Sequence, residues 1–186
     1  YHIYAFTFHC MAMMLIGNHN VLISNPRDLP AMVKELGKWK FSGFVGLNTL
    51  FVALCNNEGF RALDFSALKI TLSGGMALQL SVAERWKAVT GCAICEGYGM
   101  TETSPVAAVN PAEANQVGTI GIPVPSTLCK IIDDSGQELA LGEVGELCVK
   151  GPQVMKGYWL REDATAEILD ADGWLKTGDI ALIQTD

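Results

Sequence analysis

The sequence is short of basic residues and has no run of them. Its 186 residues include 13 Lys and Arg against 20 Asp and Glu, which gives a formal net charge of -7. A basic face for nucleic acid or for an anionic membrane surface is therefore disfavoured. An acidic chain can still bind a phosphorylated ligand, provided that backbone N–H groups and a metal ion meet the phosphates.

A membrane-spanning run and a signal peptide are also missing from the sequence. The longest apolar stretch, Ala5 to Ile16, is too short to cross a bilayer and contains His9. It has neither the basic front nor the small-residue cleavage site of a signal peptide. We expect this stretch to form a helix.

A second C-x-x-C pair is absent, which weakens a metal or disulfide interpretation of the six cysteines. Cys92 and Cys95 form the one such pair and open a predicted strand, where positions three apart face opposite sides. The other four cysteines are scattered along the chain. We expect reduced, partly buried thiols in a cytoplasmic protein.

Strand and helix patterns alternate through residues 1–104. The strand-like segments are "FSGFVG", "KITL" and "AICEGYG", with a short β-like run at Asn20–Ser24. Asp28 signals the start of one helix, residues 47–57 fit a second, and Ser81 with Glu84 fits the capping box of a third that ends at Gly91. This alternation predicts an α/β fold, with a mainly parallel sheet flanked by helices.

The pattern changes after residue 104. Residues 105–186 contain short strands separated by turn signals such as Asp-Asp-Ser-Gly, and helical spacing returns around Glu162–Ile168. We therefore expect two subdomains, 1–104 and 105–186, the second being β-rich, antiparallel and like a distorted barrel.

Two glycine-rich junctions follow predicted strands, at "TLSGGMAL" and "EGYGMTETSP". In an open parallel sheet, ligands collect at the carboxyl ends of the strands. Gly74, Gly75, Gly97 and Gly99 would let the backbone approach a flat ring or a phosphate. Tyr98 could stack on a heterocycle. Tight turns alone would also explain these glycines.

Hydroxyl and carboxylate groups stand next to the glycines. Thr101 offers a hydroxyl and an N–H to a phosphate oxygen, and Glu102 is a hard oxygen ligand that suits Mg²⁺. Asp179, in "DGWLKTGDIA", could accept hydrogen bonds from both hydroxyls of a ribose. Helix capping by Thr101 and Glu102, and a turn role for Asp179, remain open alternatives. No Walker-type loop is present, which excludes a P-loop NTPase for this segment.

Several long motifs together resemble the adenylate-forming acyl-CoA synthetases, in order and in approximate spacing. They are "SGGMAL", "GYGMTETSP", "VGTIGIPVP", "GELCVKGPQVMKGYW" and "DGWLKTGDIA". The sequence is most similar to bacterial long-chain fatty-acid–CoA ligases, and the resemblance covers essentially the whole chain. It implies a fragment of the large N-terminal domain of such an enzyme.

The resemblance also implies a role for each matching residue. The adenine and phosphate site would comprise Gly74, Gly75, Met76, Gly97, Tyr98, Gly99 and Thr101. Thr101 would contact the α-phosphate, Glu102 would hold Mg²⁺ and Asp179 would bind the ribose. His2 and Phe6 would border the fatty-acyl site, although a loop or core role for His2 is equally open. The apolar run Ala5–Ile16 would belong to the core first and to the wall of the acyl tunnel second.

The implied reaction joins a fatty acid to coenzyme A with ATP, through an acyl-adenylate. Both ends of the sequence look cut, because it begins at Tyr1 without an initiator Met and stops just after the apolar run Ile180–Ile183. Two lysine-bearing segments of the family are also not found in it. We therefore expect the piece alone to be inactive, and peripheral membrane contact is left open for its full-length parent. Alternatives are an aryl-CoA ligase, a luciferase-like enzyme, an amino-acid adenylation module, or a non-catalytic nucleotide-binding module.

Overall fold

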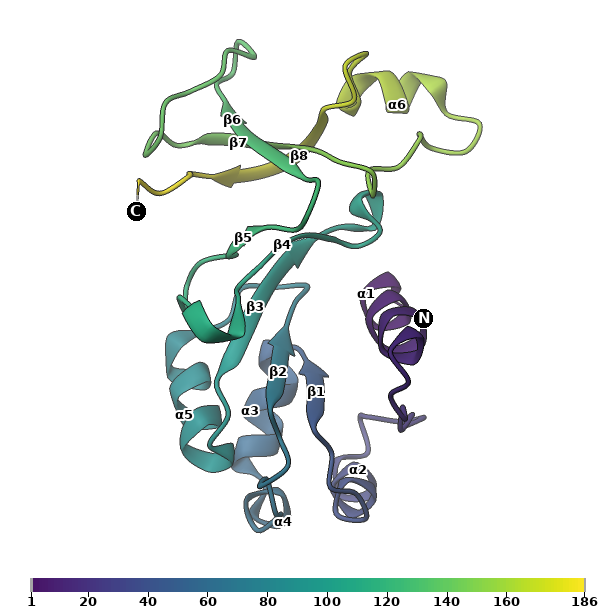
Figure 1. The fold of residues 1–186 in the computed structure, drawn as a ribbon, viewed down its shortest axis with the longest axis vertical. Helices are drawn as coiled ribbons and strands as arrows, with labels where there is room; N and C mark the ends of the chain where they lie inside the picture. The colour runs from purple at the N-terminus through teal and green to yellow at the C-terminus, as the bar shows by residue number, and fades with distance from the viewer. Residues whose placement is uncertain (1, 186) are drawn as a thin grey trace. The chain divides into compact units, whose positions relative to one another are not determined.

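The structure is a computed structural model that describes residues 2–185, and its chain divides into two compact units. The first unit comprises residues 2–99 and 108–122, and the second comprises residues 100–107 and 123–185. The chain thus leaves the first unit, returns to it once and leaves it again. The ribbon in Figure 1 lets the reader follow this path by its colour. Within the described residues, no helix is long and apolar enough to cross a membrane.

A five-stranded sheet contains the strand-ends that the sequence singles out. Its order is β1 (Gly43–Gly46), β2 (Ile70–Ser73), β3 (Ile94–Gly99), β4 (Val106–Val109) and β5 (Ile122–Pro123). The pairs β1–β2 and β2–β3 are parallel, and Leu72 of β2 pairs with Val45 on one side and Cys95 on the other. The prediction of an α/β fold with a mainly parallel arrangement is confirmed for these strands.

The first unit contains helices before and between its strands. They are α1 (Ile3–Ala5), the π-helix η1 (Phe6–Met13), α2 (Leu29–Leu36), α3 (Asn48–Asn56), α4 (Glu58–Arg61), α5 (Leu80–Thr90) and the 3₁₀ turn η3 (Ala112–Ala114). Asp28 caps α2 by accepting a hydrogen bond from the Ala31 N–H at 3.1 Å, and Gly91 ends α5 with a φ of 75°. The predicted capping box at Ser81 is wrong, because Gln79 is the N-cap of α5.

The core of the first unit is aromatic. Trp86 of α5 is fully buried, and its ring centroid lies 4.8 Å from that of Phe51 and 5.4 Å from that of Phe60. The Trp86 Nε1–H donates to Thr71 Oγ1 at 3.2 Å, so the one polar atom of the indole is satisfied inside the core. This hydrogen bond joins α5 to β2.

The apolar run near the start of the chain behaves differently from the expectation. Residues 3–13 are helical, as predicted, but none of them is buried, so their placement in the core is wrong for this structure. An apolar helix normally buries its surface, and this one leaves Met11 and Met14 more than half exposed. The β-like run predicted at residues 20–24 forms no strand.

The second unit is built on an antiparallel sheet, which agrees with the predicted change of pattern. Its strands are β6 (Leu128–Ile132), β7 (Gly145–Lys150) and β8 (Leu175–Ala181), with α6 (Glu162–Ile168) before β8 and the 3₁₀ turn η2 (Thr101–Thr103) at its first segment. Leu147, Val149 and Leu175 are buried on this sheet.

The six cysteines are free thiols in the structure. Four of them are buried: Cys55, Cys92, Cys95 and Cys148.

Candidate functional site

The two glycine-rich junctions leave the same edge of the first unit's sheet. Ser73, the last residue of β2, pairs with Glu96 of β3, so the glycines after Ser73 lie beside those at the end of β3. A Cβ added to Gly97 would stand 3.6 Å from the Ala108 carbonyl oxygen and 3.9 Å from that of Ser73. Neighbouring parallel strands thus present their carboxyl ends together, where ligands of open α/β sheets bind.

Gly74 and Gly75 are required for different reasons. A Cβ on Gly74 would lie 3.1 Å from the Tyr4 ring, so the missing side chain makes room for that aromatic ring. Gly75 has a φ of 81°, a conformation that residues with a Cβ rarely adopt. Met76, which follows, has a side chain that is 52% exposed. Gly74 is therefore buried beneath Tyr4, whereas Gly75 and the Met76 thioether are exposed at the strand edge.

Tyr4 brings a buried hydroxyl to this edge. Within the described residues, its Oη and the Ser73 Oγ are buried and have no hydrogen-bond partner. Burial raises the pKa of Tyr4, so the phenol stays protonated across the physiological range. Buried polar atoms without a partner cost free energy, which makes them candidates to meet a ligand or water.

Glu96 is a residue that the sequence analysis did not single out. Its Oε1 accepts a hydrogen bond from the Leu78 N–H at 3.3 Å, and its Oε2 accepts one from the Gly118 N–H at 2.8 Å. Its carbonyl oxygen accepts a third from the Asn110 N–H at 2.8 Å. Glu96 therefore fixes the segment after β2 and the segment after β4 to strand β3.

Thr101 and Glu102 open the first segment of the second unit. The buried Thr103 holds this turn, since its hydroxyl donates to the Pro105 carbonyl at 2.7 Å and accepts from the Met100 N–H at 3.0 Å. Thr101 is exposed, so its hydroxyl and N–H can face a ligand. Glu102 is half-buried, and its Oε1 accepts a hydrogen bond from the Tyr158 hydroxyl at 2.7 Å.

Asp179 stands on an irregularity in β8. The ladder between β7 and β8 is regular except opposite Leu147, where the pairing shifts between Glu146 and Cys148. Gly178, with a φ of 76°, donates its N–H to the Glu146 carboxylate at 2.9 Å, and the Asp179 N–H bonds to Thr177 Oγ1 at 3.1 Å. Such bulges redirect a side chain and are frequent beside active sites.

The predicted acyl-site residues lie at the start of the first unit. His2 is exposed and caps α1, its Nδ1 accepting a hydrogen bond from the Tyr4 N–H at 3.2 Å. Phe6 is 54% exposed at the beginning of η1. Capping explains His2 without a ligand, so the acyl role of both residues stays a prediction.

The predicted nucleotide residues are divided between the units. Gly74, Gly75 and Tyr98 belong to the first, whereas Glu102 and Asp179 belong to the second. Their meeting around one nucleotide therefore stays a prediction.

A metal ion would depend on few protein ligands. Among residues 2–185, no three side chains of His, Cys, Asp and Glu form a group that could hold a metal ion. Mg²⁺ commonly binds through one or two carboxylates together with substrate phosphates and water. A half-buried carboxylate with one oxygen held by a neutral hydroxyl, as in Glu102, fits that kind of site.

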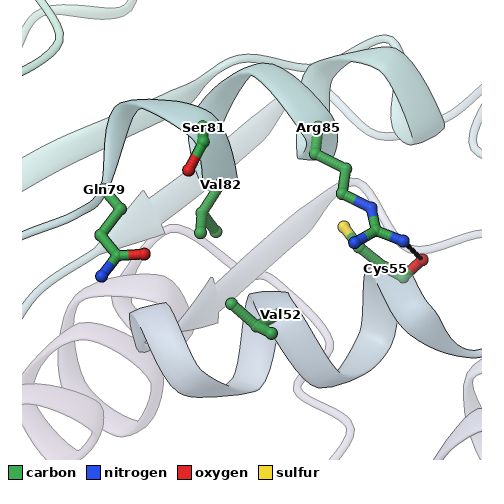
Figure 2. A pocket seen from close by; sticks show the side chains of 6 residues that line it. All are labelled: Val52, Cys55, Gln79, Ser81, Val82 and Arg85. Carbon is green, nitrogen blue, oxygen red and sulfur yellow. Dashed lines mark hydrogen bonds between the residues drawn. The ribbon is translucent and has the colours of Figure 1, made fainter.

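A separate groove lies between α3 and α5 in the first unit, and Figure 2 shows its lining. It has a volume of about 260 Å³ and contains none of the predicted site residues. Arg85 crosses it to donate to the Cys55 carbonyl at 3.2 Å, and Arg61 donates to the same oxygen at 3.1 Å. Burial raises the pKa of the Cys55 thiol, against the opposing effect of Arg85. The two arginines thus satisfy a carbonyl in the last turn of α3.

Comparison with known proteins decides the family. The model of the AMP-binding enzyme family matches residues 1–159. The chain belongs to the AMP-binding enzyme family. Its matched range contains the glycine junctions, Thr101 and Glu102, while Asp179 lies beyond it.

Relatives of this family are similar along the whole chain. A long-chain-fatty-acid–CoA ligase of Salmonella typhimurium is 54% identical over 100% of this chain and 33% of its own length. A crystal structure of a long-chain-fatty-acid–CoA ligase from Archaeoglobus fulgidus matches with a TM-score of 0.81 and 25% identity, over 98% of this chain and 40% of that one. A benzoate CoA ligase from Burkholderia xenovorans gives a TM-score of 0.83 and 28% identity, over 93% and 35%. The chain spans about a third of the length of the curated relatives that it matches.

Proposed function

We propose that this chain is the nucleotide- and acyl-binding portion of a long-chain fatty-acid–CoA ligase that uses ATP and coenzyme A. The observation that carries the proposal is the 54% identity to the Salmonella typhimurium ligase over the full length of this chain. The proposal includes a cytoplasmic location and a place in the large N-terminal domain. Residues 1–104 would carry the adenine and acyl sites, and residues 105–186 would form the β-rich, barrel-like part with the ribose-binding Asp179.

In the first half of the reaction, a fatty-acid carboxylate oxygen attacks the α-phosphorus of ATP. The new oxygen–phosphorus bond forms the acyl-adenylate, and the bond to pyrophosphate breaks. Thr101, exposed at the start of η2, would donate its hydroxyl and N–H to an α-phosphate oxygen. Glu102 would hold Mg²⁺, which supplies neutralisation of the phosphate charge when bound.

In the second half, the thiolate of coenzyme A attacks the acyl carbonyl carbon and forms the thioester. The carbon–oxygen bond between the acyl group and the phosphate breaks, and AMP leaves with that oxygen. The protein contributes mainly alignment to this step. Asp179, held on the bulge of β8, would accept hydrogen bonds from both ribose hydroxyls. Tyr98 and the backbone at Gly74 and Gly75 would hold the adenine, with Gly75 as the exposed one of the two glycines.

The ribose contact can be tested by titrating AMP against Asp179→Ala in the full-length ligase that carries this segment. Where the natural polypeptide is not at hand, this segment can replace the matching third of the Salmonella typhimurium relative. Hydrogen bonds to a charged acceptor contribute about 1.5–3 kcal/mol each, so losing two should weaken AMP binding by about 100-fold or more. Asp134→Ala, an exposed aspartate in the turn after β6, is the matched control. Equal affinities for the two variants would remove Asp179 from the site.

The substrate class needs a separate assay. Pyrophosphate release by the same enzyme would be measured with palmitate, benzoate and a set of amino acids. The proposal expects palmitate to give the highest kcat/KM. A preference for benzoate or an amino acid would favour an aryl-CoA ligase or an adenylation module, and AMP binding without turnover would favour a non-catalytic module.

A further inference from the structure

The segment that precedes α6 is fastened to Glu102 at two points within the second unit. The Met155 N–H donates to the Glu102 carbonyl oxygen at 2.8 Å. The Tyr158 hydroxyl donates to the Glu102 Oε1 at 2.7 Å, across 56 positions of sequence. Backbone and side chain of Glu102 are therefore both held by the same short segment.

Tyr158 is itself held in place by α6. Its N–H donates to Thr165 Oγ1 at 2.9 Å, and that hydroxyl donates in turn to the Arg161 carbonyl at 2.8 Å. Gly157 has a φ of 146°, and a Cβ there would come within 2.9 Å of Thr165 Cγ2. The approach of Tyr158 to α6 thus needs a glycine before it, and the phenol projects from a fixed backbone.

The chemistry of this contact suits a carboxylate that binds a cation. A tyrosine hydroxyl donates one hydrogen bond and brings no positive charge, so it orients a carboxylate without neutralising it. The bond occupies Oε1 and leaves Oε2 for a metal ion. A lysine or arginine at the same place would compete with the cation. Hydrogen bonds of this kind commonly orient the carboxylates that bind metals.

We propose that Tyr158 is a positioning residue for Glu102, orienting its carboxylate toward the Mg²⁺ that accompanies the nucleotide. The inference rests on the proposed function, in which Glu102 holds that ion. The competing interpretation is a latch that stabilises the fold of the second unit and has no effect on metal affinity.

The test compares four variants of the full-length ligase that carries this segment. Tyr158→Phe removes the hydroxyl alone, and Thr165→Val loosens the backbone that carries it. Trp159→Phe is the control, since this neighbouring aromatic side chain is 87% exposed. Glu102→Gln tests the metal ligand itself. Mn²⁺, a spectroscopic probe of Mg²⁺ sites, would be titrated by electron paramagnetic resonance in the presence of a non-hydrolysable ATP analogue.

We expect Tyr158→Phe to weaken Mn²⁺ binding by about 10-fold or more, the size seen when a partner of a metal ligand is lost. Thr165→Val should give a smaller change in the same direction, and Trp159→Phe none. The Mg²⁺ dependence of pyrophosphate release should shift in parallel, while the KM for coenzyme A stays the same.

The outcomes separate the two levels of the proposal. If Glu102→Gln weakens Mn²⁺ binding and Tyr158→Phe and Thr165→Val do not, the positioning role is wrong and the proposed function stands. If Glu102→Gln itself leaves Mn²⁺ binding unchanged, the metal role of Glu102 fails and the inference about Tyr158 fails with it. A lower melting temperature for Tyr158→Phe with unchanged Mn²⁺ affinity would establish the latch instead.

Discussion

Replacing Glu96 by glutamine tests whether one carboxylate organises the edge of the first unit's sheet. Glu96 accepts the Leu78 N–H on one oxygen and the Gly118 N–H on the other. Glutamine keeps the shape of the side chain but can accept on one side only. Its NH₂ group would face a backbone N–H on the other side, where two donors repel each other.

The size of the effect follows from the geometry. The amide oxygen should keep the shorter bond, to Gly118 at 2.8 Å, and the 3.3 Å bond to Leu78 should be lost. A hydrogen bond to a charged group contributes about 1.5–3 kcal/mol, and a long bond lies toward the lower end of that range. We therefore expect Glu96→Gln to lower the free energy of unfolding by about 2 kcal/mol, a change of roughly 30-fold in the folded-to-unfolded ratio.

Urea unfolding of the chain, followed by far-UV circular dichroism, would measure this loss. Glu113→Gln is the matched control, because Glu113 is an exposed acid in η3 of the same unit. Hydrogen exchange adds a local measurement. Protection of the Leu78 N–H should fall by more than the global loss of stability accounts for, since its partner is gone.

Two results would refute this reasoning. One is an equal free energy of unfolding for Glu96→Gln and Glu113→Gln. This would mean that the hydrogen bonds to the Glu96 carboxylate stabilise the fold no more than hydrogen bonds to water would. The other is unchanged protection of the Leu78 N–H, which would mean that this amide has a different partner in solution.

Three further predictions concern stability. Trp86→Phe removes the hydrogen bond to Thr71 and puts a smaller ring in the core. Thermal unfolding should therefore show a loss of about 2–3 kcal/mol in the free energy of unfolding, and a loss below about 1 kcal/mol would contradict the packing described. Gly178 has a φ of 76°, which strains any residue with a Cβ even though that Cβ would meet no atom within 4 Å. Gly178→Ala should therefore lower the free energy of unfolding in urea by about 1–2 kcal/mol, and an unchanged value would mean that the bulge relaxes. Hydrogen bonds from Ser135 lower the pKa of Asp133. The contribution of Asp133 to the stability of the fold is therefore full above the ordinary carboxyl pKa of about 4 and is lost as the pH falls through the lowered pKa. Asp133→Asn should therefore be less stable than wild type near about pH 7, and the difference in free energy of unfolding should narrow as the pH falls below about 4. A gap that does not change with pH would exclude this linkage.

Much of the first unit could be predicted because its signals are local. Asp28 caps α2 as its position before an apolar pattern indicates, and Gly91 ends α5 in the left-handed conformation that favours glycine. The start of α5 was predicted incorrectly for a tertiary reason. Gln79 donates its N–H to the Asn48 side chain at 3.1 Å, and this contact from α3 sets the start of the helix before Ser81.

The glycine junctions could be predicted as strand ends, but not the residues that hold them. Glu96 stands inside the quoted motif "EGYGMTETSP", and Tyr158 stands inside "GELCVKGPQVMKGYW". Their partners, however, lie 18 and 22 positions away for Glu96 and 56 for Tyr158. Hydrogen bonds at such separations depend on how the chain folds back, which spacing within a motif does not reveal. A buried-looking carboxylate in a strand was the one local signal for Glu96.

The bulge at Asp179, in the second unit, likewise depends partly on the local sequence and partly on long-range pairing. The sequence shows a glycine directly before this acid, and in the structure Gly178 has a φ of 76°. Which face Asp179 takes is decided by the pairing of β8 with β7, where a single shift in register moves a side chain to the other side of the sheet. A motif therefore fixes which chemical groups are available, and long-range pairing fixes where they point. Because the proposed ribose contact needs both, its direct test is the variant that keeps the pairing and removes only the carboxylate.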